Sequence, residues 1–252
     1  MGKLDGKVAI VTGGSRDIGR AVCVKLAKEG ARVAVNYFDS EADADATLQA
    51  IADAGGAKAI KVHADLTKSA DVQALVAKTQ EAFGEAIDIL VNVAGGLVAR
   101  KTIDEMDEDF FNFLMQLNMT STFLATKAVV PHMGEGSAIV NFASQAGRDG
   151  GGPGASAYAA SKGAVMTWTR AMSKELGPKG IRVNGLCPGM IATRFHDDFT
   201  NPEARKNVAA ATDLKREGTA EETADVVAYL VSGEASFLAG INLDINGGLA
   251  YS

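Results

Sequence analysis

Apolar runs rich in valine and isoleucine recur along the chain and alternate with longer amphipathic stretches. Each run is nearly continuous, which is typical of strands that are covered on both faces of a parallel sheet. The expected strands are residues 7–13, 32–37, 59–66, 87–94, 138–144, 181–188 and 241–245. The expected helices are residues 18–29, 41–54, 69–83, 107–133, 157–177 and 219–232. This alternation with short connections predicts an α/β fold, a doubly wound parallel sheet of about seven strands with helices on both faces.

The connections give no sign of a second domain. We find no linker, repeat or low-complexity segment, so residues 1–252 are expected to form a single domain. The glycine-rich stretch 147–155 is expected to be a loop within that domain. Residues 194–215 form one long connection without a clear strand, and we interpret this segment as a candidate lid over a site.

Composition narrows the class of protein. The formal net charge of −6 argues against a nucleic-acid partner, which would favour a basic surface. No apolar run is long enough for a membrane span, and the N-terminus lacks the features of a signal peptide, so we expect a cytoplasmic protein. Cys23 and Cys187 have no neighbours at metal-ligand spacing, and we expect no metal site.

The first glycine-rich run, Thr12 to Arg20, reads TGGSRDIGR and joins the first strand to the first helix. Such a turn is typical of the Rossmann-type fold, because its glycines let backbone N–H groups approach a pyrophosphate at a helix N-terminus. Taken alone the signal is weak, since an ordinary tight turn has the same residues. Asp17 puts a carboxylate in this turn, and we interpret it as an N-cap that faces the helix backbone and Arg20.

Further turn residues follow other strands of the predicted sheet. Asp65 and Leu66 end the third strand, residues 92–95 end the fourth, and Pro188 and Gly189 follow the sixth. Ligands of open α/β sheets bind at the carboxyl ends of the strands, so these residues are expected at one edge. Taken one at a time, these residues are also the types commonly found in ordinary turns without a ligand.

The end of the second strand bears on the choice of nucleotide. An acidic residue there usually holds the ribose 2′-hydroxyl of NAD, but here Tyr37 ends the strand and the first acid, Asp39, falls past the expected position. Arg16 in the glycine-rich turn can pair with a 2′-phosphate as a bidentate fork. The sequence therefore favours NADP(H), with NAD(H) as the alternative.

Three residues predict proton transfer beside that nucleotide. The fifth strand ends at Ser144, and Tyr158 and Lys162 follow at i and i+4 on one helix face. A nearby ammonium is expected to lower the pKa of the phenol, which can then exchange a proton with a carbonyl oxygen. The serine hydroxyl can hydrogen-bond the same oxygen.

Taken in order, the motifs resemble those of the short-chain dehydrogenase/reductase family over essentially the whole chain. They are TGGSRDIG, Asp65-Leu66, NVAG at 92–95, Asn118 in LNMTSTF, Ser144, YAASK at 158–162 and PGMIAT at 188–193. The resemblance implies a catalytic tetrad of Asn118, Ser144, Tyr158 and Lys162, with Asn118 anchoring a water in a proton relay through Lys162. It implies a homotetramer as well.

The same resemblance implies roles for the remaining motif residues. Phosphate contacts would come from the turn, adenine contacts from the third strand end, and nicotinamide contacts from the sixth. The implied nucleotide-binding residues are Gly13, Ser15, Arg16, Asp17, Ile18, Gly19, Tyr37, Asp65, Leu66, Asn92, Ala94, Gly95, Tyr158, Lys162, Pro188, Gly189, Ile191 and Thr193. Two positions depart from the family pattern: Asp17 replaces a glycine and Val93 replaces an asparagine.

Basic residues in the segments around the expected substrate suggest a small anionic substrate. They are Arg100, Lys101, Arg148, Arg194 and His196. We expect Ser144, Arg148, Tyr158 and His196 to contact it. The strings AGGLVARK, GGGPGASAY, ATRFHDDF and LDINGG resemble those of 4-deoxy-L-erythro-5-hexoseulose uronate reductases, which act on the keto acid released from alginate.

Two other functions remain open from the sequence. The first is reduction of a 3-oxoacyl group on an acyl carrier protein, against which Glu135 just before the fifth strand argues mildly. The second is a noncatalytic NADP sensor, which has no need of both Tyr158 and Lys162.

Overall fold

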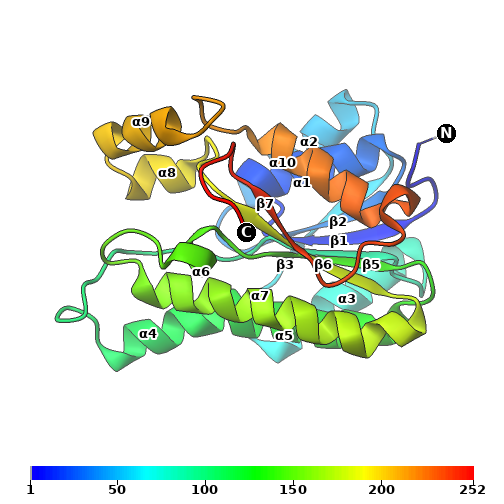
Figure 1. Cartoon of the computed structure of the whole chain (residues 1–252). Coiled ribbons are helices and arrows are strands. Elements are labelled where there is room, and N and C mark those ends of the chain that lie inside the picture. Colours follow the sequence, from blue (N-terminus) through cyan, green and yellow to red (C-terminus); the bar gives the residue numbers. More distant parts are fainter. Residues whose placement is uncertain (1) are drawn as a thin grey trace.

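A sheet of seven parallel strands forms the centre of the structure, a computed structural model that describes residues 2–252 (Figure 1). The strand order is β3-β2-β1-β4-β5-β6-β7. The strands are β1 (Val8–Thr12), β2 (Arg32–Tyr37), β3 (Ala59–His63), β4 (Ile89–Asn92), β5 (Ala138–Phe142), β6 (Arg182–Pro188) and β7 (Asn242–Ile245). The predicted fold class and all seven strands are confirmed.

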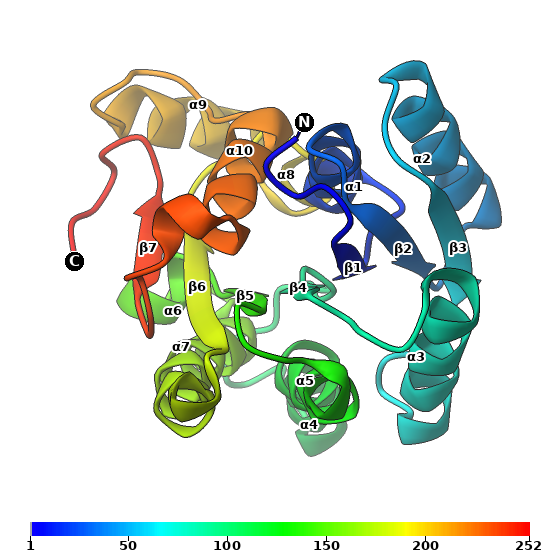
Figure 2. The ribbon, with the colours of Figure 1, turned by 90° about the vertical axis from the view of Figure 1, so that its right-hand side faces the viewer.

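Helices cover both faces of this sheet, as Figure 2 shows in an end-on view. One face carries α1 (Asp17–Lys28), α2 (Glu41–Asp53) and α10 (Ala220–Val231), and the other carries α3 (Ser69–Phe83), α4 (Glu108–Met115), α5 (Ser121–Val129) and α7 (Ser156–Leu176). Alternate residues of β1 belong to two separate cores: Ala9 and Val11 pack with α1, whereas Val8 and Ile10 pack with α3. Burial on both faces explains why the strands are continuously apolar.

The order of the strands reverses between β1 and β4, which pair side by side although helices α1 to α3 separate them in sequence. Connections after these two strands therefore leave on opposite faces of the sheet and open a crevice beyond their carboxyl ends. The glycine-rich turn after β1 and the loop after β4 form the two sides of this crevice.

Two segments differ from the sequence-based expectation. The single helix expected at 107–133 is interrupted by a π-helical turn, Gln116–Thr120, between α4 and α5. A short helix, α6 (Ala146–Asp149), takes up the first three residues of the loop expected at 147–155. Neither apolar periodicity nor propensity marks the π turn, which is a local adjustment of hydrogen bonding of the kind often found at functional sites.

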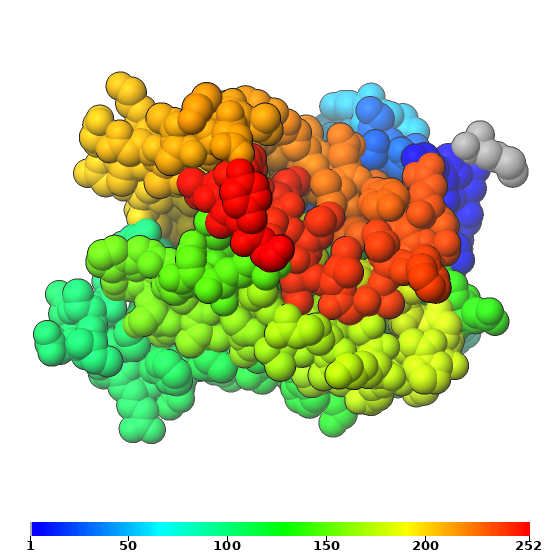
Figure 3. Space-filling view, in the orientation of Figure 1, coloured from blue at the N-terminus to red at the C-terminus, as the bar shows by residue number. Residues whose placement is uncertain are grey.

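The long connection 194–215 folds into two helices, α8 (Arg194–Phe199) and α9 (Pro202–Ala211). In Figure 3 the yellow and gold segment that contains them stands above the green segments around α6, at the end of the molecule where the strands terminate. This position matches the predicted lid. Among residues 2–252, no helix has both the length and the apolar character needed to cross a bilayer.

Candidate active site

A cleft of about 840 Å³ opens at the carboxyl ends of the strands and extends from the β2 end to the lid. It is lined by the predicted nucleotide-binding residues Gly13, Ser15, Arg16, Asp17, Ile18, Gly19, Tyr37, Asp65, Leu66, Ala94, Gly95, Tyr158, Lys162, Pro188, Gly189, Ile191 and Thr193. Ser144 and His196 also line it, whereas Asn92, Asn118 and Arg148 do not.

The glycine-rich turn leaves a row of backbone donors at the cleft. The amides of residues 15–19 have no hydrogen-bond acceptor within the described chain, whereas the next amide, that of Arg20, donates to the carbonyl of Arg16. A Cβ on Gly13 would lie 3.0 Å from Cα of Ala94, and Gly13 has a φ of 61°. Free donors at a helix N-terminus fit the pyrophosphate of a dinucleotide.

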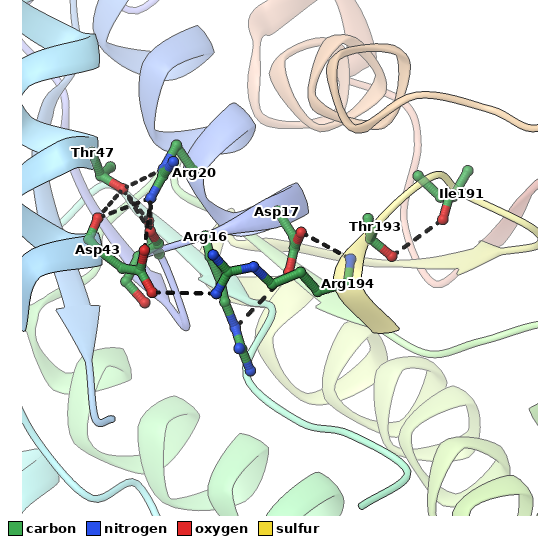
Figure 4. Close-up of polar contacts among 10 residues, drawn as sticks. Arg16, Asp17, Arg20, Asp43, Thr47, Ile191, Thr193 and Arg194 are labelled. Carbon is green, nitrogen blue, oxygen red and sulfur yellow. Dashed lines mark hydrogen bonds and ion pairs between the residues drawn. The ribbon is translucent and has the colours of Figure 1, made fainter. Parts of the chain in front are cut away.

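The expectation that Asp17 caps its own helix is wrong. The N-cap residue of α1 is Arg16, whose side chain makes no capping hydrogen bond. Asp17 has a φ of 50°, and its Oδ1 instead accepts a hydrogen bond from the backbone N–H of Arg194 at 3.2 Å (Figure 4). Arg20 faces away from Asp17 and donates to the carbonyl oxygens of Ser15 and Asp43. The left-handed φ turns the Asp17 carboxylate outward, which sequence periodicity does not reveal.

Aromatic side chains build the end of the cleft beside β2. Tyr37 and Phe38 line it, and both contact the imidazole of His63, with ring centroids 5.4 and 5.8 Å apart. Asp65 accepts two hydrogen bonds from Thr67, at 2.6 and 3.0 Å. Neither Phe38, which follows β2, nor His63, which ends β3, was predicted at this site, although these places at strand ends offered the signal.

Asp39 also lines this end of the cleft, although the sequence placed it past the ribose. The chain turns back after Phe38 and leads into α2, so Asp39 stays at the edge of the cleft. A carboxylate is therefore present near the end of β2, and it weakens the sequence argument against NAD(H).

Asn92 belongs inside the sheet, which corrects its assignment to the cleft. Its side chain is buried, and Nδ2 donates to Oδ1 of Asn141 on β5 at 2.9 Å. Asn141 in turn donates to Oγ1 of Thr169 on α7 at 3.0 Å. This chain of buried polar groups links β4, β5 and α7. Val93, which departs from the family pattern, does line the cleft.

Ser144, Tyr158 and Lys162 come together at the lid end of the cleft. Lys162 Nζ donates to the carbonyl oxygen of Phe142 at 2.7 Å and lies 5.9 Å from the centre of the Tyr158 ring. Oγ of Ser144 accepts the N–H of Ala146 at 3.1 Å, which leaves the serine O–H free to donate into the cleft.

Asn118 lies behind the cleft wall, on the π-helical turn. Its Nδ2 donates to the carbonyls of Gly96 and Leu114, both at 3.0 Å, and its Oδ1 accepts the N–H of Gly96 at 2.9 Å. A Cβ on Gly95 would collide with Oδ1 of Asn118 and come within 3.2 Å of Lys162 Nζ. The side-chain amide thus holds the loop after β4, and the predicted anchoring of a relay water by Asn118 stays a prediction.

Burial sets the protonation states of the catalytic pair. It raises the pKa of Tyr158, while the Ser144 hydroxyl acts in the opposite direction with a smaller effect. It also lowers the pKa of Lys162 to about 8. The expected lowering of the phenol pKa by the ammonium is therefore wrong for this structure, because desolvation opposes the phenolate. A protonated phenol at neutral pH is the form that a proton donor needs.

The end of the cleft that is expected to hold the nicotinamide is formed by the residues just after β6. A Cβ on Gly189 would lie 2.9 Å from Cα of Asn246, so the chain passes closer than other residues allow. Ile191 forms an isolated parallel bridge with Gly218, and Thr193 Oγ1 donates to the carbonyl of Ile191 at 3.2 Å. These contacts bring Ile191 and Thr193 to the cleft just before the lid begins.

Arg148 does not reach the substrate end, which corrects its predicted role. Its guanidinium donates to Oδ1 of Asp244 at 2.6 Å and to the carbonyl of Asn242 at 2.5 Å, and so fastens α6 to β7. The sequence could not show this, because Asp244 lies 96 residues further along the chain.

Arg100 and the lid define the substrate end. Arg100 lines the cleft and donates to the carbonyls of Phe199 and Pro153, at 3.1 and 3.0 Å. The ring of Phe195 lies 5.9 Å from that of Tyr158. Burial lowers the pKa of His196, whose Nδ1 lies 2.9 Å from Oγ1 of Thr200. His196 is therefore neutral at pH 7, and Arg100 is a better candidate to meet an anion.

The arrangement as a whole has room for an extended ligand and donors for phosphates at its centre. A protonated phenol and a hydroxyl converge at the lid end, where a carbonyl oxygen could meet both. These groups suit transfer of a hydride from a nicotinamide nucleotide with transfer of a proton from the protein.

Comparisons with known proteins agree with this geometry. A family model described as enoyl-(acyl carrier protein) reductase matches residues 13–250. Glucose 1-dehydrogenase 2 of Bacillus subtilis is 36% identical over 252 residues, which cover 98% of this chain and 95% of that protein.

Two solved structures add the nucleotides that relatives use. A short-chain dehydrogenase from Burkholderia cenocepacia in complex with NADP has a TM-score of 0.91 and 35% identity, and the match covers 98% of this chain and 99% of that chain. The NADH-dependent reductase A1-R′, responsible for alginate metabolism, has a TM-score of 0.89 and 33% identity, with 99% of each chain covered.

Proposed function

The chain belongs to the short-chain dehydrogenase/reductase family, whose members are NAD(P)-dependent and act on CH–OH groups, and from this premise we propose that it reduces a small anionic keto sugar acid. The proposed substrate is 4-deoxy-L-erythro-5-hexoseulose uronate and the preferred nucleotide is NADPH. The observation that carries the reaction is the convergence of Ser144, Tyr158 and Lys162 on one end of the cleft.

Each of these three residues has a separate role at the carbonyl oxygen of the substrate. When bound, the nicotinamide supplies the hydride. Tyr158 donates its phenolic proton to the oxygen, and the free O–H of Ser144 hydrogen-bonds to the same atom. The ammonium of Lys162, fixed by the carbonyl of Phe142, stabilises the phenolate that remains.

The polar groups at the lid end support a polyhydroxylated acid. Arg100 supplies a cation for a carboxylate, and two of its N–H-bearing nitrogens are held by backbone carbonyls, which orients the fork. Neutral His196 and the carboxylates of Asp149 and Asp198 also line the cleft and can hydrogen-bond sugar hydroxyls. The alginate reductase among the similar structures supports the same substrate class.

NADPH preference is supported by Arg16, which lines the cleft. Its guanidinium is loosely held, with Nε 3.9 Å from Oδ2 of Asp17, so it is free to pair with a 2′-phosphate. Asp39 is the opposing feature, and similar structures include both NADP-bound and NADH-dependent proteins.

The alternative is reduction of 3-oxoacyl thioesters. Apolar side chains also line the lid end of the cleft, among them Leu97, Phe113, Phe195, Phe199 and Val208. An acyl chain could contact these groups, and the matching family model carries an acyl-carrier description.

A substrate panel separates these functions. Uronate-derived keto acids, neutral keto sugars and 3-oxoacyl thioesters are each tested with NADPH and with NADH, and we expect the highest kcat/KM for the keto acid with NADPH. Arg100→Gln should lower kcat/KM for the keto acid but not for a neutral keto sugar, which controls for its contacts to the lid. Activity confined to thioesters would reject the substrate, and no turnover of any carbonyl would favour a noncatalytic sensor.

We also propose that the protein works as a cytoplasmic homotetramer. The exposed apolar residues Phe237, Tyr229 and Leu243 on α10, β7 and the segment between them are candidates for a buried interface. Both cysteines are free and buried, as a reducing compartment allows. Light scattering of the purified chain should give about four times the monomer mass, and a monomeric mass would reject this assembly.

A further inference from the structure

Arg194 crosses the nucleotide groove from one side to the other. It begins α8, directly after Thr193 at the nicotinamide end, and its Nη1 lies 3.6 Å from Oδ2 of Asp43 on α2. Figure 4 shows its side chain extending from the lid over the glycine-rich turn toward Asp43, close to Arg16. The guanidinium therefore lies above the part of the turn, residues 15–19, whose amides have no acceptor among residues 2–252.

Both ends of Arg194 are held by carboxylates. Asp17 accepts its backbone N–H at 3.2 Å, and Asp43 faces its guanidinium. Asp43 is itself fixed, because its N–H is accepted by Ser40 and its Oδ1 lies 3.5 Å from Nη2 of Arg20. Asp43 thus offers the guanidinium a well-held partner on the far side of the groove.

The ion pair of Arg194 is weak enough to exchange. The side chain is 58% exposed and the nearest N–O distance is 3.6 Å, so the pair adds little stability in water. By contrast, Arg205 on α9 is bound to both Asp197 and Glu217 and is not available. A phosphate at the turn would offer Arg194 a stronger, bidentate partner than Asp43 does.

We propose that Arg194 is a phosphate-binding residue of the nucleotide site, which closes over the pyrophosphate from the lid. Asp43 holds the guanidinium in advance, and Asp17 ties the first amide of α8 to the glycine-rich turn. The proposal rests on NAD(P) binding and not on the proposed substrate or on NADPH preference. It also accounts for the carboxylate of Asp17, since a glycine at that position has no side chain to accept the N–H of Arg194.

The test measures dissociation constants by calorimetry for NADP⁺, NAD⁺, ADP and adenosine. Arg194→Met keeps the aliphatic part of the side chain. It should raise the dissociation constants of NADP⁺, NAD⁺ and ADP by a common factor of about ten and leave that of adenosine unchanged. Arg216→Met is the matched control, because Arg216 is a half-exposed arginine paired with Glu222 that does not line the cleft. It should bind all four probes as the wild type does.

Each outcome decides the assignment. Unchanged dissociation constants for Arg194→Met would overturn the proposal. A loss for NADP⁺ alone would overturn the pyrophosphate assignment and place Arg194 at the 2′-phosphate. Since NAD⁺ and ADP serve as probes, the result does not depend on which substrate or nucleotide the enzyme prefers.

Two substitutions at Asp17 test its hydrogen bond to the backbone N–H of Arg194, which ties the glycine-rich turn to the lid. Asp17→Asn keeps an acceptor oxygen for the N–H of Arg194, whereas Asp17→Gly removes the side chain and tolerates the φ of 50°. We expect the Asp17→Asn variant to bind NAD⁺ with nearly unchanged affinity. The Asp17→Gly variant should bind NAD⁺ several-fold more weakly and show faster hydrogen exchange in residues 194–199. Equal exchange in both variants would overturn the tie, and a large gain in affinity for both would show that the carboxylate repels the pyrophosphate.

Discussion

The side-chain amide of Asn118 makes two hydrogen bonds with the backbone of Gly96: Oδ1 accepts the N–H at 2.9 Å and Nδ2 donates to the carbonyl at 3.0 Å. Asn118 is fully buried on the π-helical turn, so this pair fixes the loop after β4 beside Lys162. The wall of the cleft next to the catalytic lysine therefore depends on one side chain outside the cleft.

Replacing Asn118 by leucine should lower both stability and activity. The change removes two hydrogen bonds to the partly buried backbone of Gly96 and one to the buried carbonyl of Leu114, which should reduce the free energy of unfolding by about 2–3 kcal/mol. Denaturant unfolding measures this loss. Thr79→Val is the control, because the buried Thr79 hydroxyl makes one bond, to Leu75 of its own helix, and its loss should cost about 1 kcal/mol. Equal stability of Asn118→Leu and wild type would contradict the role given to the pair.

Tyr158→Phe should keep the nucleotide and stop turnover. The substitution removes only the hydroxyl, and loss of a general acid typically lowers kcat by about 10²–10⁴-fold. Fluorescence titration with NADPH should give a dissociation constant near that of the wild type. Rates within a few-fold of the wild type would show that another group delivers the proton.

The rate of reduction should fall as the pH rises through about 8. Burial lowers the pKa of Lys162 to about 8, so its ammonium is present below that pH and lost above it. Tyr158 keeps its proton through this range, because burial raises its pKa. The pH profile of kcat/KM reports these free-enzyme groups.

Lys162→Arg offers a comparison for the same profile. A guanidinium stays charged at every accessible pH, so the activity that remains should no longer fall near pH 8. A wild-type profile that is flat up to pH 9.5 would be incompatible with a required ammonium of lowered pKa.

Arg16→Ala should raise KM for NADPH much more than for NADH. The guanidinium is about half exposed and its only carboxylate neighbour within the described chain lies 3.9 Å away, so a 2′-phosphate could recruit it at little cost. We expect KM for NADPH to rise about ten-fold, since the variant loses a charge-assisted pair with the 2′-phosphate. Lys68→Ala provides the control, because Lys68 is an exposed cation near the same end that does not line the cleft. Equal effects of Arg16→Ala on both nucleotides would remove the argument for NADPH.

Arg148→Met should reduce stability without affecting substrate binding. Its partly buried pair with Asp244 joins α6 to β7, and removing one partner leaves the carboxylate without its cation. We expect a loss of about 2 kcal/mol in unfolding free energy and an unchanged KM for the substrate. A large rise in KM with unchanged stability would restore Arg148 to the substrate site.

The periodicity of apolar residues and the turn residues between the apolar runs were sufficient to predict the fold. Continuous apolar runs predict strands buried on both faces, and the two separate cores on either side of β1 give the reason. The catalytic residues could also be predicted from the sequence, because Tyr158 and Lys162 are one helical turn apart and Ser144 follows β5 by two residues. Local spacing along regular elements is enough to bring such residues together.

Contacts between distant segments were decided only by the tertiary structure. Asp17 and Arg194 lie 177 residues apart, and Arg148 and Asp244 lie 96 apart, so no local pattern pairs them. The left-handed φ of Asp17 turned a predicted helix cap into a contact with the lid. Burial likewise reversed the expected pKa shift of Tyr158, because desolvation depends on all the surrounding atoms and not on sequence neighbours. The sequence by itself determined which elements form and which residues can do chemistry, whereas the packing of those elements decided which charges meet and which protons are held.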